Sequence, residues 1–121
     1  MFMKKAKTLI LPAMLMLLFS LLAGCSSEPA KPIDIVITAK DMMFTPDRIT
    51  VDKGSSIKLT FRNQEGVVND LMMKGTDVMI QDVGPNQEKS TTFTADRAGT
   101  FTIMTSAPGM ENMTADFIVK E

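Results

Sequence analysis

Short runs in which apolar and polar residues alternate dominate this chain beyond residue 32. Ile33, Ile35 and Ile37 are separated by single residues, and the same spacing recurs over 49–51 and 57–61. Successive side chains of a β-strand point to opposite faces, so a period of two is typical of strands with one buried face. No helical period interrupts this pattern, and the chain is therefore restricted to an all-β fold.

Turn-forming residues separate these runs. Clusters rich in Gly, Asn, Asp and Pro occur at 52–55, 63–66, 84–86 and 96–99. Further strands are expected over 68–73, 89–94, 100–105 and 114–120. About seven short strands at this spacing predict a Greek-key β-sandwich or barrel.

The first 24 residues have the composition of an export signal. Lys4, Lys5 and Lys7 precede an apolar run from Thr8 to Leu22 that is short for a bilayer span and contains Pro12. The run ends in Leu-Ala-Gly-Cys, which resembles the lipobox of bacterial lipoproteins. We therefore expect a signal peptide over 1–24, a lipidated Cys25 followed by a tether over 25–32, and one domain over 33–121.

A lipidated Cys25 places the domain outside the cytoplasm, anchored to a bacterial membrane by its acyl chains. The membrane is then the first expected partner, and the sulfur of Cys25 is a thioether that cannot form a disulfide.

Composition excludes several classes of function. Removing Lys4, Lys5 and Lys7 from the thirteen basic residues leaves ten against fourteen acidic ones, and the chain has no Trp or Tyr, which argues against nucleic acid as a partner. It has no His, and no Cys besides Cys25, so the usual catalytic base, zinc ligands and thiolate nucleophiles are missing. An enzyme is not expected. Methionine thioethers are the soft metal ligands that remain.

Two separated motifs carry a family resemblance. The segment Phe-Thr-Pro-Asp-Arg-Ile-Thr-Val-Asp-Lys-Gly-Ser-Ser-Ile-Lys-Leu-Thr-Phe-Arg-Asn over 44–63 looks like the opening of a bacterial cupredoxin domain. Ala-Gly-Thr-Phe-Thr-Ile over 98–103 is similar to the strand before the copper-binding loop, and Ser-Ala-Pro-Gly over 106–109 to the start of that loop. The resemblance covers 33–121 and implies a cupredoxin-like sandwich.

The same resemblance implies that the type 1 copper ligands have been replaced. In the family, a His after the third strand and a Cys, a His and an axial Met from one loop hold copper. Here those positions fall on Asn69, Thr105, Met110 and Met113, with the loop about two residues shorter than usual. Without a thiolate, the family's blue-copper electron transfer is not expected. A hydrogen bond between Asn69 and Thr105 is expected across the vacated ligand positions.

Methionines near these positions suggest a different kind of copper site. The segment joining the first two strands lies at the same end in cupredoxins, and here it contains Met42 and Met43. Together with Met110 and Met113 these residues form a candidate copper(I) site, although methionine also fills irregular apolar gaps without any metal. In the predicted strands, one of Met72 and Met73 faces inward and Met104 points away from Ile103, whereas Met79 is not placed.

Two functions therefore stay open. The first is a membrane-anchored cupredoxin-like protein that binds copper(I) for delivery or tolerance, with a copper-handling envelope protein as partner. The second is a metal-free interaction module, accessory to a membrane or envelope complex, that keeps the sandwich only as a scaffold.

Overall fold

The computed structural model describes residues 31–121, so the predicted signal peptide and Cys25 lie outside the described residues. These residues form nine strands and no helix, in agreement with the all-β prediction. The strands are β1 (Ile33–Lys40), β2 (Met43–Thr45), β3 (Arg48–Asp52), β4 (Ser56–Asn63), β5 (Asn69–Met73), β6 (Met79–Val83), β7 (Gln87–Thr94), β8 (Gly99–Met104) and β9 (Thr114–Lys120). All seven predicted strands are present, and β2 and β6 are additional.

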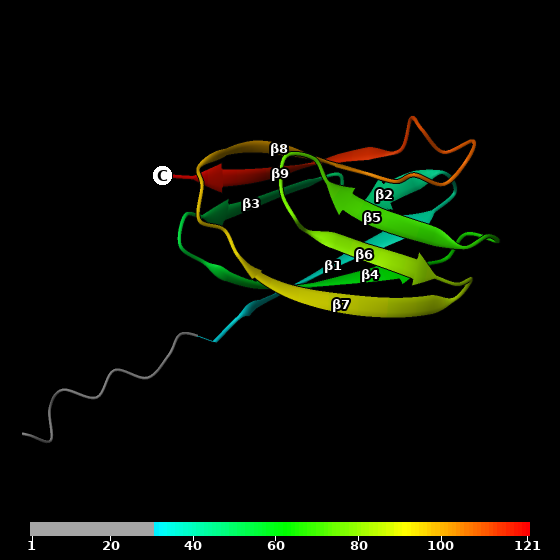
Figure 1. Ribbon diagram of the computed structural model, residues 1–121, viewed down its shortest axis with the longest axis horizontal. Coiled ribbons are helices and arrows are strands. Elements are labelled where there is room, and N and C mark those ends of the chain that lie inside the picture. The colour runs from blue at the N-terminus through cyan, green and yellow to red at the C-terminus, as the bar shows by residue number, and fades with distance from the viewer. Residues whose placement is uncertain (1–30) are drawn as a thin grey trace, which may run out of the picture.

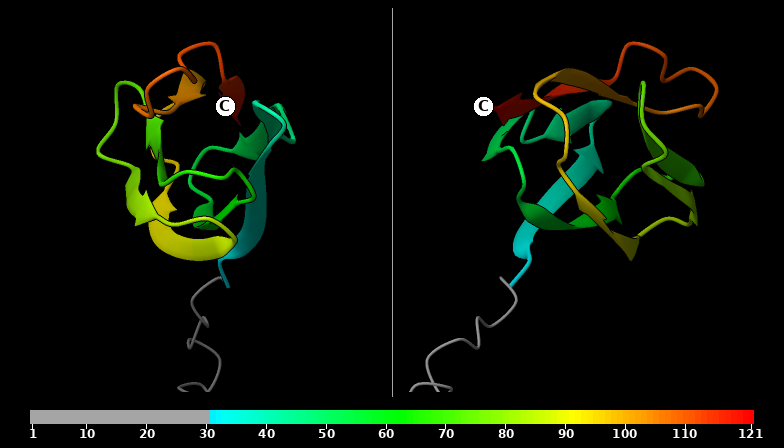
Figure 2. Two further views of the ribbon diagram at one scale, coloured as in Figure 1. Left: turned by 90° about the vertical axis from the view of Figure 1, so that its right-hand side faces the viewer. Right: turned by 60° about the vertical axis from the view of Figure 1, so that its left-hand side comes forward.

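The strands form two curled sheets packed face to face (Figures 1 and 2). One sheet has the order β2-β1-β4-β7, and the other has the order β3-β9-β8-β5-β6. The pairs β1/β4 and β3/β9 are parallel, and the remaining neighbours are antiparallel. The chain crosses repeatedly between the sheets, which gives the predicted sandwich its non-sequential strand order.

The core lies between the sheets and is built from the alternate apolar residues that define the period of two. In β4, Ile57, Leu59 and Phe61 are fully buried while the residues between them face outward. Phe117 enters the same core from β9. Burying one such side chain contributes about 1.5–3 kcal/mol, so the inward rows of both sheets hold the sandwich together.

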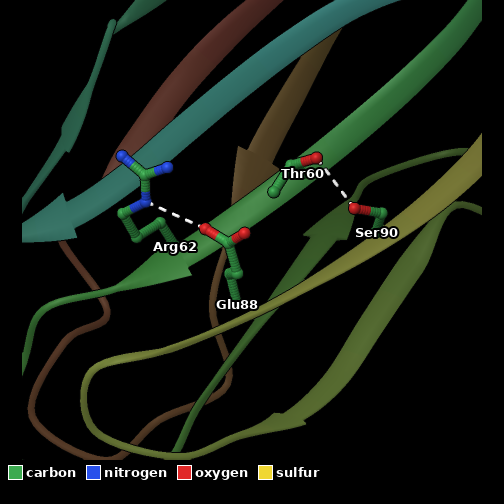
Figure 3. Close-up of polar contacts among 4 residues, drawn as sticks. All are labelled: Thr60, Arg62, Glu88 and Ser90. Atoms are coloured by element: carbon green, nitrogen blue, oxygen red, sulfur yellow. Dashed lines mark hydrogen bonds and ion pairs between the residues drawn. The ribbon is translucent and has the colours of Figure 1, made fainter.

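The outer face of the four-stranded sheet is polar along β4 and β7. Thr60 and Ser90 lie directly opposite each other on β4 and β7, and their hydroxyl oxygens are 2.8 Å apart. Two residues further along the same strands, Arg62 Nε donates to Glu88 Oε2 at 3.0 Å (Figure 3). These cross-strand pairs keep the face soluble, as expected for a sheet with one solvated side.

Neither additional strand has a clear pattern in the sequence. The strand β2 has only three residues, too few to display a period. In β6 the buried residues are Ile80 and Val83, three positions apart, because the pairing with β5 shifts register and Asp82 has a positive φ of 57°. A β-bulge of this kind breaks the alternation that predicts a strand.

The strands have two distinct ends. The β1–β2 turn and the β4–β5 and β8–β9 loops gather at the right-hand end of Figure 1, which we call the loop end. At the other end, β1 begins and the C-terminus lies. No helix within residues 31–121 is long and apolar enough to cross a membrane.

Candidate functional site

Two successive turns in the β8–β9 loop position the candidate ligands Met110 and Met113. Pro108 and Gly109 occupy the centre of the first turn, where Gly109 has a φ of 82° and the Met110 amide donates to the Ala107 carbonyl at 3.1 Å. Pro followed by Gly with positive φ is the signature of a type II turn. In the second turn the Met113 amide donates to the Met110 carbonyl at 3.0 Å. Both methionine side chains are buried.

The vacated ligand positions are joined by hydrogen bonds inside the protein. Thr105 Oγ1 donates to Asn69 Oδ1 at 2.5 Å, which confirms the predicted contact. Asn69 Nδ2 donates to Met110 Sδ at 3.5 Å. Three of the four mapped positions, Thr105, Asn69 and Met110, are thus linked by a chain of two hydrogen bonds. The Asp70 amide, 2.9 Å from Asn69 Oδ1, fixes the orientation of the Asn69 side chain because that donor requires an oxygen.

Asp70, the residue after Asn69, ties β5 to the β8–β9 loop from the outside. Its carboxylate accepts bonds from the Ser106 amide at 2.8 Å and from the Ser106 hydroxyl. Its Oδ1 also lies 3.0 Å from Thr105 Oγ1, which has one proton to share between Asp70 and Asn69. Partial burial acts to raise the pKa of Asp70, but the bonds from Ser106 and Thr105 outweigh it and lower that pKa below its ordinary value.

Asn63 is a structural residue of this end that the sequence analysis did not single out. It is fully buried at the end of β4. Its Nδ2 donates to the carbonyls of Val67 and Val83, both at 2.8 Å, and its Oδ1 accepts from the Glu65 amide at 3.0 Å. Asn63 thus fastens the β4–β5 loop, which delivers Asn69, to β6. In the sequence it is marked only as the last residue of the 44–63 motif and the first of the turn-forming cluster 63–66.

Met42 and Met43 differ from the loop methionines in their environment. Asp41 and Met42 have φ values of 52° and 61°, which are typical of a type I′ hairpin turn between β1 and β2. The Phe44 side chain enters the core, so its neighbour Met43 points away from it. Met42 is 49% exposed and Met43 60% exposed, whereas Met110 and Met113 are buried. A common site for all four therefore stays a prediction.

The donor set at the vacated positions does not fit a blue-copper centre. That centre needs a thiolate and imidazoles, whereas these positions hold an amide, a hydroxyl and thioethers. Within residues 31–121 every buried side-chain nitrogen and oxygen has a hydrogen-bond partner. The same residues contain no cluster of His, Cys, Asp and Glu suited to a metal ion. At the vacated positions, the thioethers of Met110 and Met113 are the soft donors.

Two cavities lie at opposite ends of the sandwich. A shallow cavity of about 200 Å³ borders Asn69, Asp70, Asp82 and Ser106 at the loop end. A larger cavity of about 460 Å³ lies at the other end. Its lining includes Phe93, Phe101 and Phe117, together with Arg97, which donates to the Gly75 carbonyl at 2.6 Å. The larger cavity therefore lies away from the mapped ligand positions, which are at the loop end.

Comparison with known proteins agrees with the fold. A family model described as a cupredoxin-like domain matches residues 11–119. Among curated proteins, none matches this sequence.

Three solved structures illustrate the similarity. Auracyanin A, a "blue" copper protein from Chloroflexus aurantiacus, is 21% identical with a TM-score of 0.66, over 74% of this chain and 100% of its own. Auracyanin from Roseiflexus castenholzii is 19% identical with a TM-score of 0.64, over 76% and 100%. The metal-binding domain of the Cu(I)-exporting ATPase CopA from Streptococcus pneumoniae, solved with Cu(I), is 20% identical with a TM-score of 0.63, over 79% and 93%. At these identities the likeness concerns the fold alone.

Proposed function

This chain belongs to the cupredoxin-like domain family, and from that premise we propose that it is a membrane-anchored, extracytoplasmic copper(I)-binding protein rather than a blue-copper electron carrier or an enzyme. The observation that carries the proposal is the position of Met110, whose sulfur lies 3.5 Å from Asn69 Nδ2 among the vacated ligand positions. Met113 follows one turn later in the same loop. These two thioethers are the proposed ligands.

The chemistry of thioethers supports copper(I) over other ions. A thioether is soft and uncharged, which favours copper(I) over copper(II) and zinc, and it binds without losing a proton. The Asn69–Met110 contact does not block this role, because a thioether sulfur is a weak hydrogen-bond acceptor. The CopA domain further supports the proposal, since it binds Cu(I) on the same fold. Met42 or Met43 would complete the coordination from the hairpin.

Binding of copper(I) at these ligands is expected to be nearly independent of pH around neutrality. The test is a copper(I) titration against a competing chelator, with the wild type and with Met110→Leu/Met113→Leu, which keeps the apolar volume. We expect the double variant to bind about tenfold or more weakly, because it loses both loop ligands. Equal binding by the two proteins would refute the loop site. Met43→Leu should have the smaller effect of an auxiliary ligand.

The proposed location rests on Cys25, with its acyl chains holding the protein at a bacterial membrane where a copper-handling envelope protein is the partner. Because β1 begins at the end opposite the loops, such an anchor leaves the loop end directed away from the membrane. Mass spectrometry of the mature protein should find acyl chains on Cys25, and Cys25→Ala should leave the signal over 1–24 uncleaved by the lipoprotein peptidase. An unmodified Cys25 thiol in the mature protein would contradict the anchor.

A metal-free interaction module is the second candidate, and two observations favour it. The polar groups at the vacated positions satisfy one another, as in a site refilled after metal loss. The loop end also exposes apolar side chains, since Val67 and Val68 are 50% and 59% exposed. Such exposure suits a protein contact. Failure of the wild type to bind copper(I) at any methionine would select this function.

A further inference from the structure

Three methionines lie side by side across neighbouring strands of the five-stranded sheet. Met72 of β5 is directly opposite Met79 of β6, and on its other side it is directly opposite Met104 of β8. These residues are far apart in the sequence and are brought together only by strand pairing. We call them the methionine row.

The row faces outward from the sandwich. The neighbours of its members along the strands, Leu71, Met73, Ile80 and Ile103, are buried in the core. Because side chains alternate between faces, Met72, Met79 and Met104 must share the outer face. Met79 is 45% exposed, and Met72 and Met104 are half-buried.

The other outer face shows that this composition is not general to the molecule. Between β4 and β7 of the four-stranded sheet, the directly opposed outward pairs include Thr60 with Ser90 and Arg62 with Glu88 (Figure 3). Hydroxyls and ions are what a solvated sheet face normally carries. Three adjacent thioethers contribute little to solubility, and they do not pack in the core.

Strand geometry allows the three sulfurs to converge. Directly opposed residues have their Cβ atoms about 4.5–5.5 Å apart, and the two outer members are separated by two strand spacings, or about 9.6 Å. A methionine side chain has three rotatable bonds, so Met79 and Met104 can lean toward Met72 between them. We propose that Met72, Met79 and Met104 form a surface site that binds copper(I), or a soft monovalent ion of the same chemistry, through three thioethers.

Charged residues flank Met72 on both sides along the chain, with Asp70 two residues before it and Lys74 two residues after it. Asp70 precedes Met72 by two residues in β5 and therefore lies on the same outer face. Its carboxylate is held by Ser106, so it offers negative charge near the row while its own bonds remain in place. Three neutral thioethers leave the full positive charge on a bound copper(I) ion, and a nearby carboxylate stabilises that charge.

The methionine row is separate from the proposed loop site and does not rest on it. Met110 and Met113 are buried in the core cluster, whereas the row is on the outer surface of the sheet. An exposed row can exchange its ion with a partner without opening the core, which suits delivery.

The test separates the two sites within one protein. The full chain is labelled with ¹³C at the methionine methyl groups and titrated with Ag(I), a redox-stable soft ion, and with copper(I) against a chelator. We expect the Met72, Met79 and Met104 signals to shift together, and Met72→Leu/Met104→Leu to weaken this binding about tenfold or more. Zinc should leave these signals unmoved.

The outcomes distinguish the two proposals. If the row signals do not shift, or the Met72→Leu/Met104→Leu protein binds as tightly at the row as the wild type, the methionine row is not a metal site. Shifts confined to Met110 and Met113 overturn this inference and leave the loop site standing. Shifts confined to the row, unchanged in Met110→Leu/Met113→Leu, support the inference and refute the loop site. Unchanged amide spectra in both double variants confirm that each is folded.

Discussion

Arg62 and Asn63 are neighbours at the end of β4, yet their polar side chains lie in opposite surroundings. Arg62 faces solvent on the outer face of the four-stranded sheet, where its side chain is 46% exposed and pairs with Glu88. Asn63 faces the interior with no exposure and makes three hydrogen bonds to backbone groups. The hydrogen bonds of both residues are 2.8–3.0 Å long, so bond length does not distinguish the two side chains.

Burial decides how much each contact contributes. Water replaces the partner of an exposed ion, so a surface ion pair stabilises a protein by only about 0–1 kcal/mol. A buried donor or acceptor that loses its partner has nothing to replace it and costs about 1–3 kcal/mol. The loop end therefore depends on its interior polar network, and the outer face does not depend on its paired ions.

The largest effect is expected for Asn63→Ala. Removing this amide leaves the Val67 and Val83 carbonyls and the Glu65 amide without their partner, and we expect a loss of about 3 kcal/mol in the free energy of unfolding. Chemical denaturation measures the loss. The exposed Asn112→Ala in the neighbouring loop is the control and should stay within about 0.5 kcal/mol of wild type. A similar small change for Asn63→Ala would break the comparison.

Thr105→Val should have an intermediate effect. The hydroxyl of Thr105 donates to Asn69 Oδ1 and accepts from the Ala107 amide at 3.0 Å, and valine keeps the shape without either bond. We expect a loss of about 1–2 kcal/mol in unfolding free energy. Thr105→Ser restores the hydroxyl and should recover most of the loss. If serine and valine behave alike, packing of the methyl group matters more than the hydrogen bonds.

Acid should weaken the contact between Asp70 and the β8–β9 loop. The pKa of Asp70 is lower in the folded protein than in the unfolded chain, because Ser106 and Thr105 bond its charged form. Its contribution is therefore fully present above about pH 4, near the unfolded pKa, and is lost as the pH falls through the lower folded pKa. Unfolding free energies of wild type and Asp70→Asn, measured from neutral pH downward, should converge below pH 4. A constant difference would show that the Asp70 charge is not involved.

The smallest effect is expected at Arg62 and Glu88. A double-mutant cycle with Arg62→Ala and Glu88→Ala should give a coupling energy of about 0.2–1 kcal/mol, because both side chains are about half exposed. High salt should remove most of this coupling. A coupling as large as the Asn63→Ala loss would mean that exposure does not set the value of polar contacts here.

The sequence was informative wherever a signal was local. The alternation of Ile57, Leu59 and Phe61 predicted both the strand β4 and its buried face, because the period of two is a property of the backbone itself. The resemblance to cupredoxins mapped Asn69 and Thr105 onto two ligand positions of that family, and the hydrogen bond expected between them is confirmed. The likeness of 106–109 to the start of the family's copper-binding loop likewise marked the loop that holds Met110.

Only the tertiary structure decided what depends on strand register and on packing. The bulge in β6 hid that strand and left Met79 without a place, whereas pairing with β5 sets it directly opposite Met72. No sequence spacing links Met79, Met72 and Met104, because cross-strand neighbours are chosen by the whole sheet. In the same way, the sequence grouped Met42 and Met43 with Met110 and Met113 through the resemblance to cupredoxins, but only the structure shows how each pair is exposed: Met42 and Met43 face solvent, whereas Met110 and Met113 are buried.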